Sequence, residues 1–226
     1  MKTIAIIPAR GGSKGIPGKN IMDFCGKPLI AWSILQAKHT PEIDEVYLTS
    51  DSNEILDIAK EFGASTIVRP ADIAGDTASS ESAIEHALSV IGNDVELVIM
   101  LQATSPLRKP DDLSKAIRQF REEKWDSAFS GAMLDDFLIW DLDQEGQLKS
   151  FNYDYLNRGR RQDRKSQYVE NGSFYLFKPE ILAQGNRMGG KIGVYLMEFW
   201  QTFEIDNRDD IKLMEILFQT FKDLII

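Results

Sequence analysis

The sequence contains very little cysteine and histidine. Among its 226 residues there is one cysteine, Cys25, and there are two histidines, His39 and His86. A single cysteine cannot form a disulfide within the chain, and a zinc site is not expected without a cysteine cluster or closely spaced histidines. We interpret Cys25 as a small buried apolar residue and assign no role to either histidine.

The sequence also lacks long apolar runs. None approaches the ~20 residues that a membrane-spanning helix needs. Residues 1–4 lead directly into an apolar segment, which leaves no room for the charged and apolar regions of a signal peptide. Hydrophobic residues make up 43% of the chain and charged residues 27%, as is typical of globular proteins. We therefore expect a cytoplasmic protein without a membrane partner, folded as one domain over residues 1–226.

An excess of positive charge is absent as well. The chain has 26 basic and 35 acidic residues, and the resulting net charge of −9 argues against nucleic acid as a partner. Basic residues nevertheless cluster in two places, in a loop near the N-terminus and at Arg158, Arg160, Arg161, Arg164 and Lys165. Such clusters in an acidic protein favour the binding of small anions, although a charge run can also be a solvated face.

The N-terminal loop combines glycines and cations directly after an apolar segment. Its four glycines let backbone N–H groups approach an anion closely, while Arg10, Lys14 and Lys19 supply neutralising charge. The loop fits neither the P-loop pattern nor the G-x-G-x-x-G spacing of dinucleotide-binding proteins. It predicts a polyphosphate site, and the alternative is a glycine-rich surface loop whose cations are solvated.

Short apolar segments alternate with segments of helical periodicity along most of the chain. Strands are expected at 3–8, 46–48, 66–68, 97–101, 127–132, 172–177 and 194–197. Helices are expected at 29–39, 53–62, 80–91, 110–123 and 209–225, with a short one starting at Pro179. This order predicts an α/β fold with a mainly parallel central sheet flanked by helices. Residues 134–161 break the alternation and predict a hairpin excursion outside the sheet.

Polar residues follow three of the expected strands, at the edge where open parallel sheets bind ligands. The N-terminal loop follows the first strand, Arg69 follows the third, and residues 102–108 follow the strand at 97–101. In the polar segment 75–80, Ser79 or Ser80 can cap the next helix, and capping is compatible with ligand binding.

Taken together, three of these segments resemble the N-acylneuraminate cytidylyltransferases, which activate sialic acids. They are IPARGGSKGIPGKN at 7–20, Arg69-Pro70 with DTASS at 76–80, and LQATSPLR at 101–108. Arg161-Gln162, Asn171-Gly172 and the pair Glu204 and Asp206 also fall where that family keeps sugar-site and metal-site residues, so the resemblance covers essentially the whole chain.

The resemblance implies a Rossmann-like nucleotidyltransferase fold and a specific reaction. The anomeric hydroxyl of a nine-carbon sugar acid would attack the α-phosphate of CTP, giving a CMP-sugar and pyrophosphate, with Mg²⁺ as the cofactor. By the same resemblance, residues 134–161 would be a protruding arm through which two subunits form a homodimer.

The resemblance also assigns roles to individual residues. The triphosphate would be bound by Arg10, Ser13, Lys14, Lys19 and Asn20, and the cytosine would be framed by Arg69 and Ser80. Gln102 matches a position on the sugar side, and Arg161 would pair with the sugar carboxylate, a bidentate task that suits a guanidinium. The alternative for Arg161 is an exposed cation in a basic run. In-line displacement at phosphorus depends on positioning and charge neutralisation, so the expected catalytic residues are Lys19, Arg10 and Asp206.

Glu204 and Asp206 are the expected Mg²⁺ ligands. Two carboxylates two residues apart on a strand point to one face, as coordination of a hard cation requires. The family usually has Asp at both positions, so Asp206 is the firmer ligand. The alternative is an acidic loop before a helix, a role that better suits Asp209 and Asp210 at the helix N-terminus.

The acceptor expected from the resemblance is N-acetylneuraminate. Lys165 and Val169-Glu170 depart from the family pattern in the sugar-recognition region, so KDN, legionaminate and pseudaminate stay open, and the eight-carbon acid KDO ranks lower. Two other classes of function stay open: a catalytically silent nucleotide-binding protein, and an anion-binding module whose basic loops contact another protein.

Overall fold

The computed structural model describes residues 1–12, 15–75, 77–134, 137–160, 162 and 165–225. Within these residues the main sheet is built from β1 (Lys2–Pro8), β4 (Glu45–Ser50), β5 (Ser65–Val68), β6 (Val95–Leu101), β7 (Ser127–Met133), β10 (Tyr168–Phe177) and β11 (Ile192–Leu196). The helices are α1 (Leu29–Lys38), α2 (Asn53–Glu61), α3 (Ser80–Ile91), α4 (Asp112–Glu122), α5 (Pro179–Leu182), α6 (Arg208–Thr220) and α7 (Lys222–Ile225).

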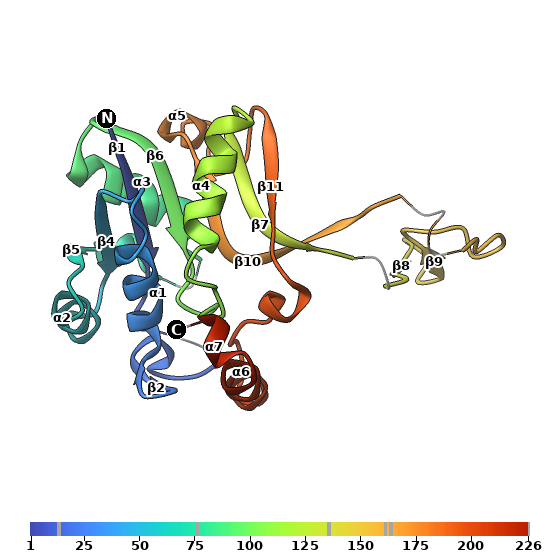
Figure 1. Cartoon of the computed structure of the whole chain (residues 1–226), viewed down its shortest axis with the longest axis horizontal. Coiled ribbons are helices and arrows are strands. Elements are labelled where there is room, and N and C mark those ends of the chain that lie inside the picture. The colour runs from blue at the N-terminus through green and yellow to red at the C-terminus, as the bar shows by residue number, and fades with distance from the viewer. Residues whose placement is uncertain (13–14, 76, 135–136, 161, 163–164, 226) are drawn as a thin grey trace.

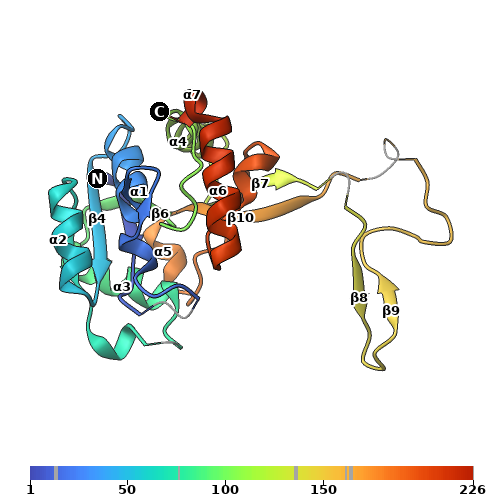
Figure 2. The same cartoon turned by 90° about the horizontal axis from the view of Figure 1, so that it is seen from below.

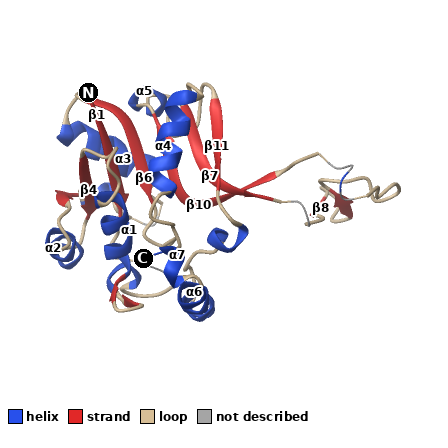
Figure 3. Cartoon of the chain, viewed as in Figure 1, coloured by secondary structure: helices blue, strands red, loops and turns tan. Residues whose placement is uncertain are grey.

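In the described part of the chain the strands form a seven-stranded sheet in the order β11-β7-β10-β6-β1-β4-β5. Neighbouring strands pair in parallel except at β10, which is antiparallel to both β6 and β7. Figures 1 and 3 show helices on both sides of this sheet. The predicted α/β fold with a mainly parallel central sheet is confirmed.

The first strand is buried on both faces because its side chains are continuously apolar. Ala5 and Ile7 pack with apolar residues of α1, α2 and α4, while Ile4 and Ile6 pack on the other face with residues of α3 and α5. Alternation along the strand sends successive side chains to opposite faces, so one apolar run serves two cores. β1 therefore ends at a fixed place in the centre of the sheet, where the N-terminal loop begins.

The C-terminal helices pack against the start of the chain. A third apolar cluster joins Phe24 of β2 (Asp23–Phe24) and Trp32 of α1 to Met214 and Phe218 of α6. The Trp32 indole N–H donates to the Phe24 carbonyl at 2.8 Å, and the Phe218 ring lies 4.8 Å from the Trp32 ring. This packing brings the segment that precedes α6 next to the N-terminal loop.

An arm leaves the body between β7 and β10. It carries the hairpin of β8 (Trp140–Leu142) and β9 (Leu148–Ser150), which pair only with each other among the described strands. In Figure 2 the hairpin stands clear of the body. Several of its apolar side chains are exposed, among them Leu142, Leu148 and Phe151.

Some predicted boundaries are wrong. α4 begins at Asp112 rather than Pro110, because the Asp112 carboxylate accepts the Lys109 backbone N–H at 2.7 Å. The predicted helix at 209–225 is two helices, separated at Phe221, whose ring stacks on Trp200 at 4.1 Å. β10 begins at Tyr168 rather than 172, because its start pairs with the end of β7 and continues into the arm.

Cys25 is only partly buried and has a φ of 53°, although it packs against the third apolar cluster.

No helix in the described residues is both long and apolar enough to cross a membrane.

Candidate active site

A cavity of about 330 Å³ opens at the carboxyl ends of β1 and β6. It is the place where polar residues were expected to gather, because parallel strands end at one edge of the sheet. Its lining residues come from the N-terminal loop, the segment after β5, the start of α3 and the loop after β6: Pro8, Arg10, Lys19, Asn20, Arg69, Ala74, Gly75, Ala78, Ser79, Ser80, Met100, Gln102, Ala103 and Thr104.

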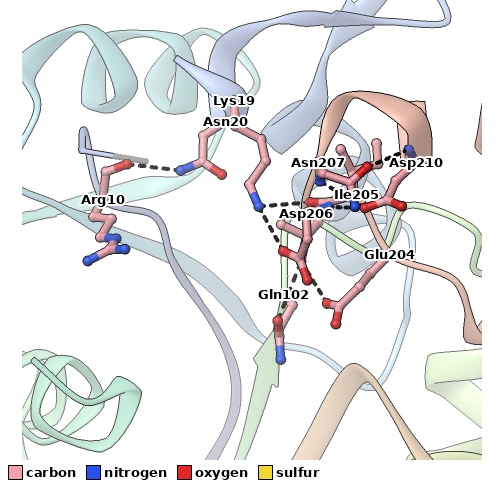
Figure 4. Close-up of polar contacts among 10 residues, drawn as sticks. Arg10, Lys19, Asn20, Gln102, Glu204, Ile205, Asp206, Asn207 and Asp210 are labelled. Atoms are coloured by element: carbon pink, nitrogen blue, oxygen red, sulfur yellow. Dashed lines mark hydrogen bonds and ion pairs between the residues drawn. The ribbon is translucent and has the colours of Figure 1, made fainter. Parts of the chain in front are cut away.

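The N-terminal loop is held in place by side chains at both of its ends. The Gly11 backbone N–H donates to Asp51 Oδ1 at 2.9 Å, which ties the loop to the residues after β4. The Asn20 amide donates to the Arg10 carbonyl at 3.0 Å and closes the loop on itself (Figure 4). Asn20 thus lines the cavity and fixes the backbone of Arg10, and the Arg10 guanidinium reaches the Gly75 carbonyl across the cavity.

Lys19 points to the segment before α6. Its Nζ donates to the Ile205 carbonyl at 2.7 Å and lies 3.0 Å from Asp206 Oδ1 (Figure 4). The Lys19 side chain is 12% exposed and that of Asp206 is 63% exposed, so the pair lies at the mouth of the cavity. The structure therefore joins a predicted phosphate-binding cation to a predicted metal ligand far away in the sequence.

Gly15 brings the same two segments into close backbone contact. A Cβ at this position would lie 2.3 Å from the Asp206 carbonyl oxygen, so only glycine fits without a shift. The backbone at Asp206 is fixed in turn, because its N–H donates to Asp210 Oδ2 at 2.8 Å. Ser13 and Lys14, which the sequence places in the same loop, lie outside the described residues.

Arg69 and the start of α3 form another wall of the cavity. Arg69 is 7% exposed, and one terminal nitrogen donates to the Thr49 carbonyl at 2.7 Å. Its Nε is buried and finds no hydrogen-bond partner within the described part of the chain. Burial lowers the pKa of Arg69. A buried donor without a partner is costly, and a ligand that accepts from it would remove that cost.

Ser79 and Ser80 serve the helix and the cavity together. The Ser79 hydroxyl accepts the Ser82 backbone N–H at 3.1 Å and caps α3, as predicted for one of these serines. Both serines also line the cavity. Capping and a position at the ligand site therefore coexist.

The loop after β6 contacts the carboxylate of Glu204. Thr104 Oγ1 lies 3.4 Å from Gln102 Oε1 and 3.3 Å from Glu204 Oε2. Burial raises the pKa of Glu204, and the nearby Asp206 charge raises it further. Gly172, with a φ of 66°, lies so close that an added Cβ would be 3.2 Å from Gln102 Nε2.

The expectation that Glu204 and Asp206 lie on a strand is wrong. They lie in an irregular segment between a 3-10 turn (Phe199–Thr202) and α6. Ile205 between them is fully buried and donates its N–H to the Thr104 carbonyl at 2.9 Å. Figure 4 shows both carboxylates on the side of Lys19 and Gln102, two residues that line the cavity.

The first turn of α6 is capped by Asn207 and by the carboxylate of Asp210. Asn207 accepts the backbone N–H groups of Asp209 and Asp210, and the Asp210 carboxylate accepts the Asn207 N–H at 2.8 Å. Asp210 therefore acts as a cap, in line with the helix N-terminus role considered for it. Glu204 and Asp206 remain the carboxylates that contact cavity-lining residues, Thr104 and Lys19.

The carboxylates of Glu204 and Asp206 suit a hard cation that also binds a substrate. No group of three histidine, cysteine or acidic side chains could hold a metal within the described residues. Mg²⁺ typically takes one or two carboxylates together with substrate phosphates, and Glu204 and Asp206 would supply that number. The repulsion that raises the pKa of Glu204 is what a divalent cation would relieve.

Arg161 lies outside the described residues, so its predicted role stays a prediction. The sequence reasoning missed Asp51, which anchors the N-terminal loop, and the contact that Gly15 makes. The position of Asp51, directly after a strand, could have indicated its role, whereas nothing in the sequence links Gly15 to Asp206.

The chain is similar to known cytidylyltransferases. A family model described as cytidylyltransferase matches residues 4–224. The chain is 35% identical to N-acylneuraminate cytidylyltransferase A of Danio rerio over 204 residues, which are 89% of this chain and 47% of that protein. It is 32% identical to a pseudaminic acid cytidylyltransferase of Campylobacter jejuni over 226 residues, with 97% of each chain covered. The chain thus spans about half the length of the fish relative and nearly all of the bacterial one.

A solved structure shares the fold. The structure of CMP:2-keto-3-deoxy-manno-octonic acid synthetase complexed with CTP superimposes with a TM-score of 0.71 at 16% identity, covering 97% of this chain and 99% of that one. This match supports the fold, while the family model and the relatives bear out the resemblance seen in the sequence motifs.

Proposed function

The chain belongs to the cytidylyltransferase family, and on that premise we propose that it transfers CMP from CTP to the anomeric hydroxyl of a nine-carbon sugar acid, releasing pyrophosphate. The observation that carries the proposal is a cavity lined by Arg10 and Lys19, with two carboxylates beside it. Asp206 pairs with Lys19, and Glu204 contacts Thr104, which also lines the cavity. Cations suit a triphosphate, and paired carboxylates suit the metal that accompanies it.

The nucleotide would lie along the N-terminal loop and α3. Arg69 and Ser80 would frame the cytosine, and the buried unpartnered Nε of Arg69 supports this because the base offers hydrogen-bond acceptors. Arg10, Lys19 and Asn20 would bind the triphosphate, together with Ser13 and Lys14. Lys19 would then exchange Asp206 for a phosphate oxygen.

Mg²⁺ would be held by Asp206 and Glu204, with Asp206 as the firmer ligand. When bound, the ion would neutralise phosphate charge and orient the triphosphate. Thr104 would keep the Glu204 carboxylate turned to the cavity through the contact at 3.3 Å.

The acceptor would enter beside Gln102. The anomeric hydroxyl oxygen of the acid forms a bond to the α-phosphorus and releases its proton to solvent, while the bond from that phosphorus to the pyrophosphate oxygen breaks. Negative charge grows on the leaving pyrophosphate, where Lys19 and Arg10 stabilise it. Arg161 would pair with the sugar carboxylate, as the family resemblance implies.

The first acceptor we propose is N-acetylneuraminate, which is one of the N-acylneuraminates that give the relative from Danio rerio its name. Pseudaminate is the second candidate, since the relative from Campylobacter jejuni matches along 97% of both chains.

We also propose that the arm forms a homodimer. Its hairpin has two strands of three residues each, and an isolated two-stranded hairpin is at best marginally stable in water. The exposed Leu142, Leu148 and Phe151 offer the apolar surface that a second copy would cover. Sedimentation of the protein as a dimer would support this, and a monomer at micromolar concentration would refute it.

The proposed function is tested by pyrophosphate release with CTP and Mg²⁺. The panel contains N-acetylneuraminate, KDN, legionaminate, pseudaminate and KDO, with a control lacking any acid. Selective release with one nine-carbon acid is the expected result. No release across the panel from protein that CTP still stabilises would indicate a silent nucleotide binder and refute the proposal.

A further inference from the structure

Arg108 is the largest fully buried side chain of the protein among the described residues, and it lies at the end of the loop after β6. One terminal nitrogen donates to the Gln102 carbonyl at 2.7 Å and to the Ser173 carbonyl at 2.5 Å. The other lies 2.9 Å from Ser33 Oγ and 2.9 Å from Gln36 Oε1, both on α1. The guanidinium therefore joins three elements: the loop after β6, β10 and α1.

Burying the Arg108 guanidinium in this way costs free energy of folding. Burial lowers the pKa of Arg108 to about 9, which still leaves it charged at neutral pH. No carboxylate of the described residues forms an ion pair with it, and its Nε has no hydrogen-bond partner there. A buried cation without a paired carboxylate costs several kcal/mol in desolvation, and hydrogen bonds to carbonyls offset this only in part.

The two carbonyls that Arg108 binds belong to neighbouring backbones, that of Gln102, which lines the cavity, and that of Ser173 in β10. The Gln102 carbonyl also accepts from Ser33 Oγ at 3.2 Å, and the Ser173 carbonyl also accepts the Gln102 backbone N–H at 3.1 Å. Next to the Ser173 carbonyl, Gly172 approaches the Gln102 side chain. The guanidinium thus sets how far the Gln102 amide stands from the backbone of β10.

We propose that Arg108 is a positioning residue that acts through Gln102 on the acceptor. The inference rests on the proposed function, in which Gln102 meets the sugar acid. The planar guanidinium fork reaches both carbonyls and α1 at once, whereas an ammonium on a flexible stem cannot hold all of these acceptors in one geometry. The hydrogen bonds of Arg69 and of the start of α3 that the structure describes do not involve Arg108, so we expect the nucleotide walls to keep their geometry without it.

Arg108→Lys and Ser33→Ala test the proposal, with Ser114→Ala as the matched control. Ser114 is also a buried serine on a helix, and its hydroxyl donates to Glu42 Oε2 at 2.6 Å rather than to the Gln102 carbonyl. Initial rates of pyrophosphate release give KM for the acid and for CTP separately. We expect Arg108→Lys to raise the KM of the acid about tenfold or more and Ser33→Ala to raise it less, with the KM of CTP changed by less than about threefold.

A merely structural role predicts a different pattern. It would lower the melting temperature of Arg108→Lys and Ser33→Ala without separating the two KM values. Folded Arg108→Lys or Ser33→Ala with both KM values unchanged, or changed equally, would overturn the proposal. If Arg108→Lys does not fold, Ser33→Ala decides. Wild-type protein that is inactive with every acid would refute the proposed function itself, and the positioning role with it.

Discussion

Replacing Gly15 by alanine tests whether the N-terminal loop and the carboxylate segment work as one unit. The added Cβ would lie 2.3 Å from the Asp206 carbonyl oxygen, whereas real Cβ atoms essentially never lie closer than 3.0 Å to such an atom. One segment must therefore move by about 0.7 Å. The Asp206 backbone is held by Asp210 and by the neighbouring bond of Ile205 to Thr104, so the loop is the part that yields.

A displacement of this size changes the place of Lys19 relative to Asp206, two groups now 3.0 Å apart. Misplacement of catalytic groups by about 1 Å can cost about 100-fold in rate, and we expect a loss of that order in kcat/KM for CTP. Stability should change little, because Gly15 lies in an exposed loop. A cost of about 1 kcal/mol would lower Tm by only about 2–4 °C.

The assay is pyrophosphate release at saturating acid, with thermal melting in parallel. Gly12→Ala is the matched control, because a Cβ at Gly12 meets nothing within 4 Å. It should lose much less activity than Gly15→Ala, because its Cβ cannot displace the Asp206 segment. Wild-type turnover by Gly15→Ala, or an equal loss in the Gly12→Ala protein, would refute the reasoning.

The remaining predictions concern three charged residues. Lys19→Ala should lower kcat about 100-fold to 1000-fold, as loss of one transition-state donor does, and kcat within about threefold of wild type would remove Lys19 from the mechanism. Asp206→Asn should abolish Mg²⁺-supported turnover in a Mg²⁺ titration, whereas full activity would eliminate Asp206 as a ligand. Arg161→Lys should raise the KM of the acid by loss of bidentate pairing, and a selective rise in the KM of CTP would reassign Arg161 to the nucleotide.

The sequence predicts the sheet and the place of the cavity well, for a physical reason. Apolar runs such as residues 4–7 suit strands buried on both faces, and the polar residues after them can only collect at the shared edge. Strand and helix ends are less predictable, because tertiary contacts set them. The stacking of Phe221 on Trp200, for example, leaves no signal in local periodicity.

The role of Arg108 shows why part of the site cannot be predicted from residue types. An arginine two residues after a proline and next to Lys109 suggests an exposed cation, yet it is completely buried. What buries it is a set of acceptors from α1 and β10, which only the fold brings together. The same holds for Gly15, whose partner lies near the other end of the chain.

The ion pair between Lys19 and Asp206 affects how substitutions at this site must be interpreted. Each group neutralises the other in the chain without ligands, so removing one leaves its partner without a counter-charge. The Lys19→Ala and Asp206→Asn effects therefore include the altered behaviour of the remaining group and should not add. Glu204 extends this coupling, because Asp206 raises its pKa and Lys19 opposes that rise. Lys19, Asp206 and Glu204 thus form one electrostatic unit. Binding of a phosphate to Lys19 would free Asp206 for a cation, and binding of a cation to Asp206 would free Lys19 for a phosphate.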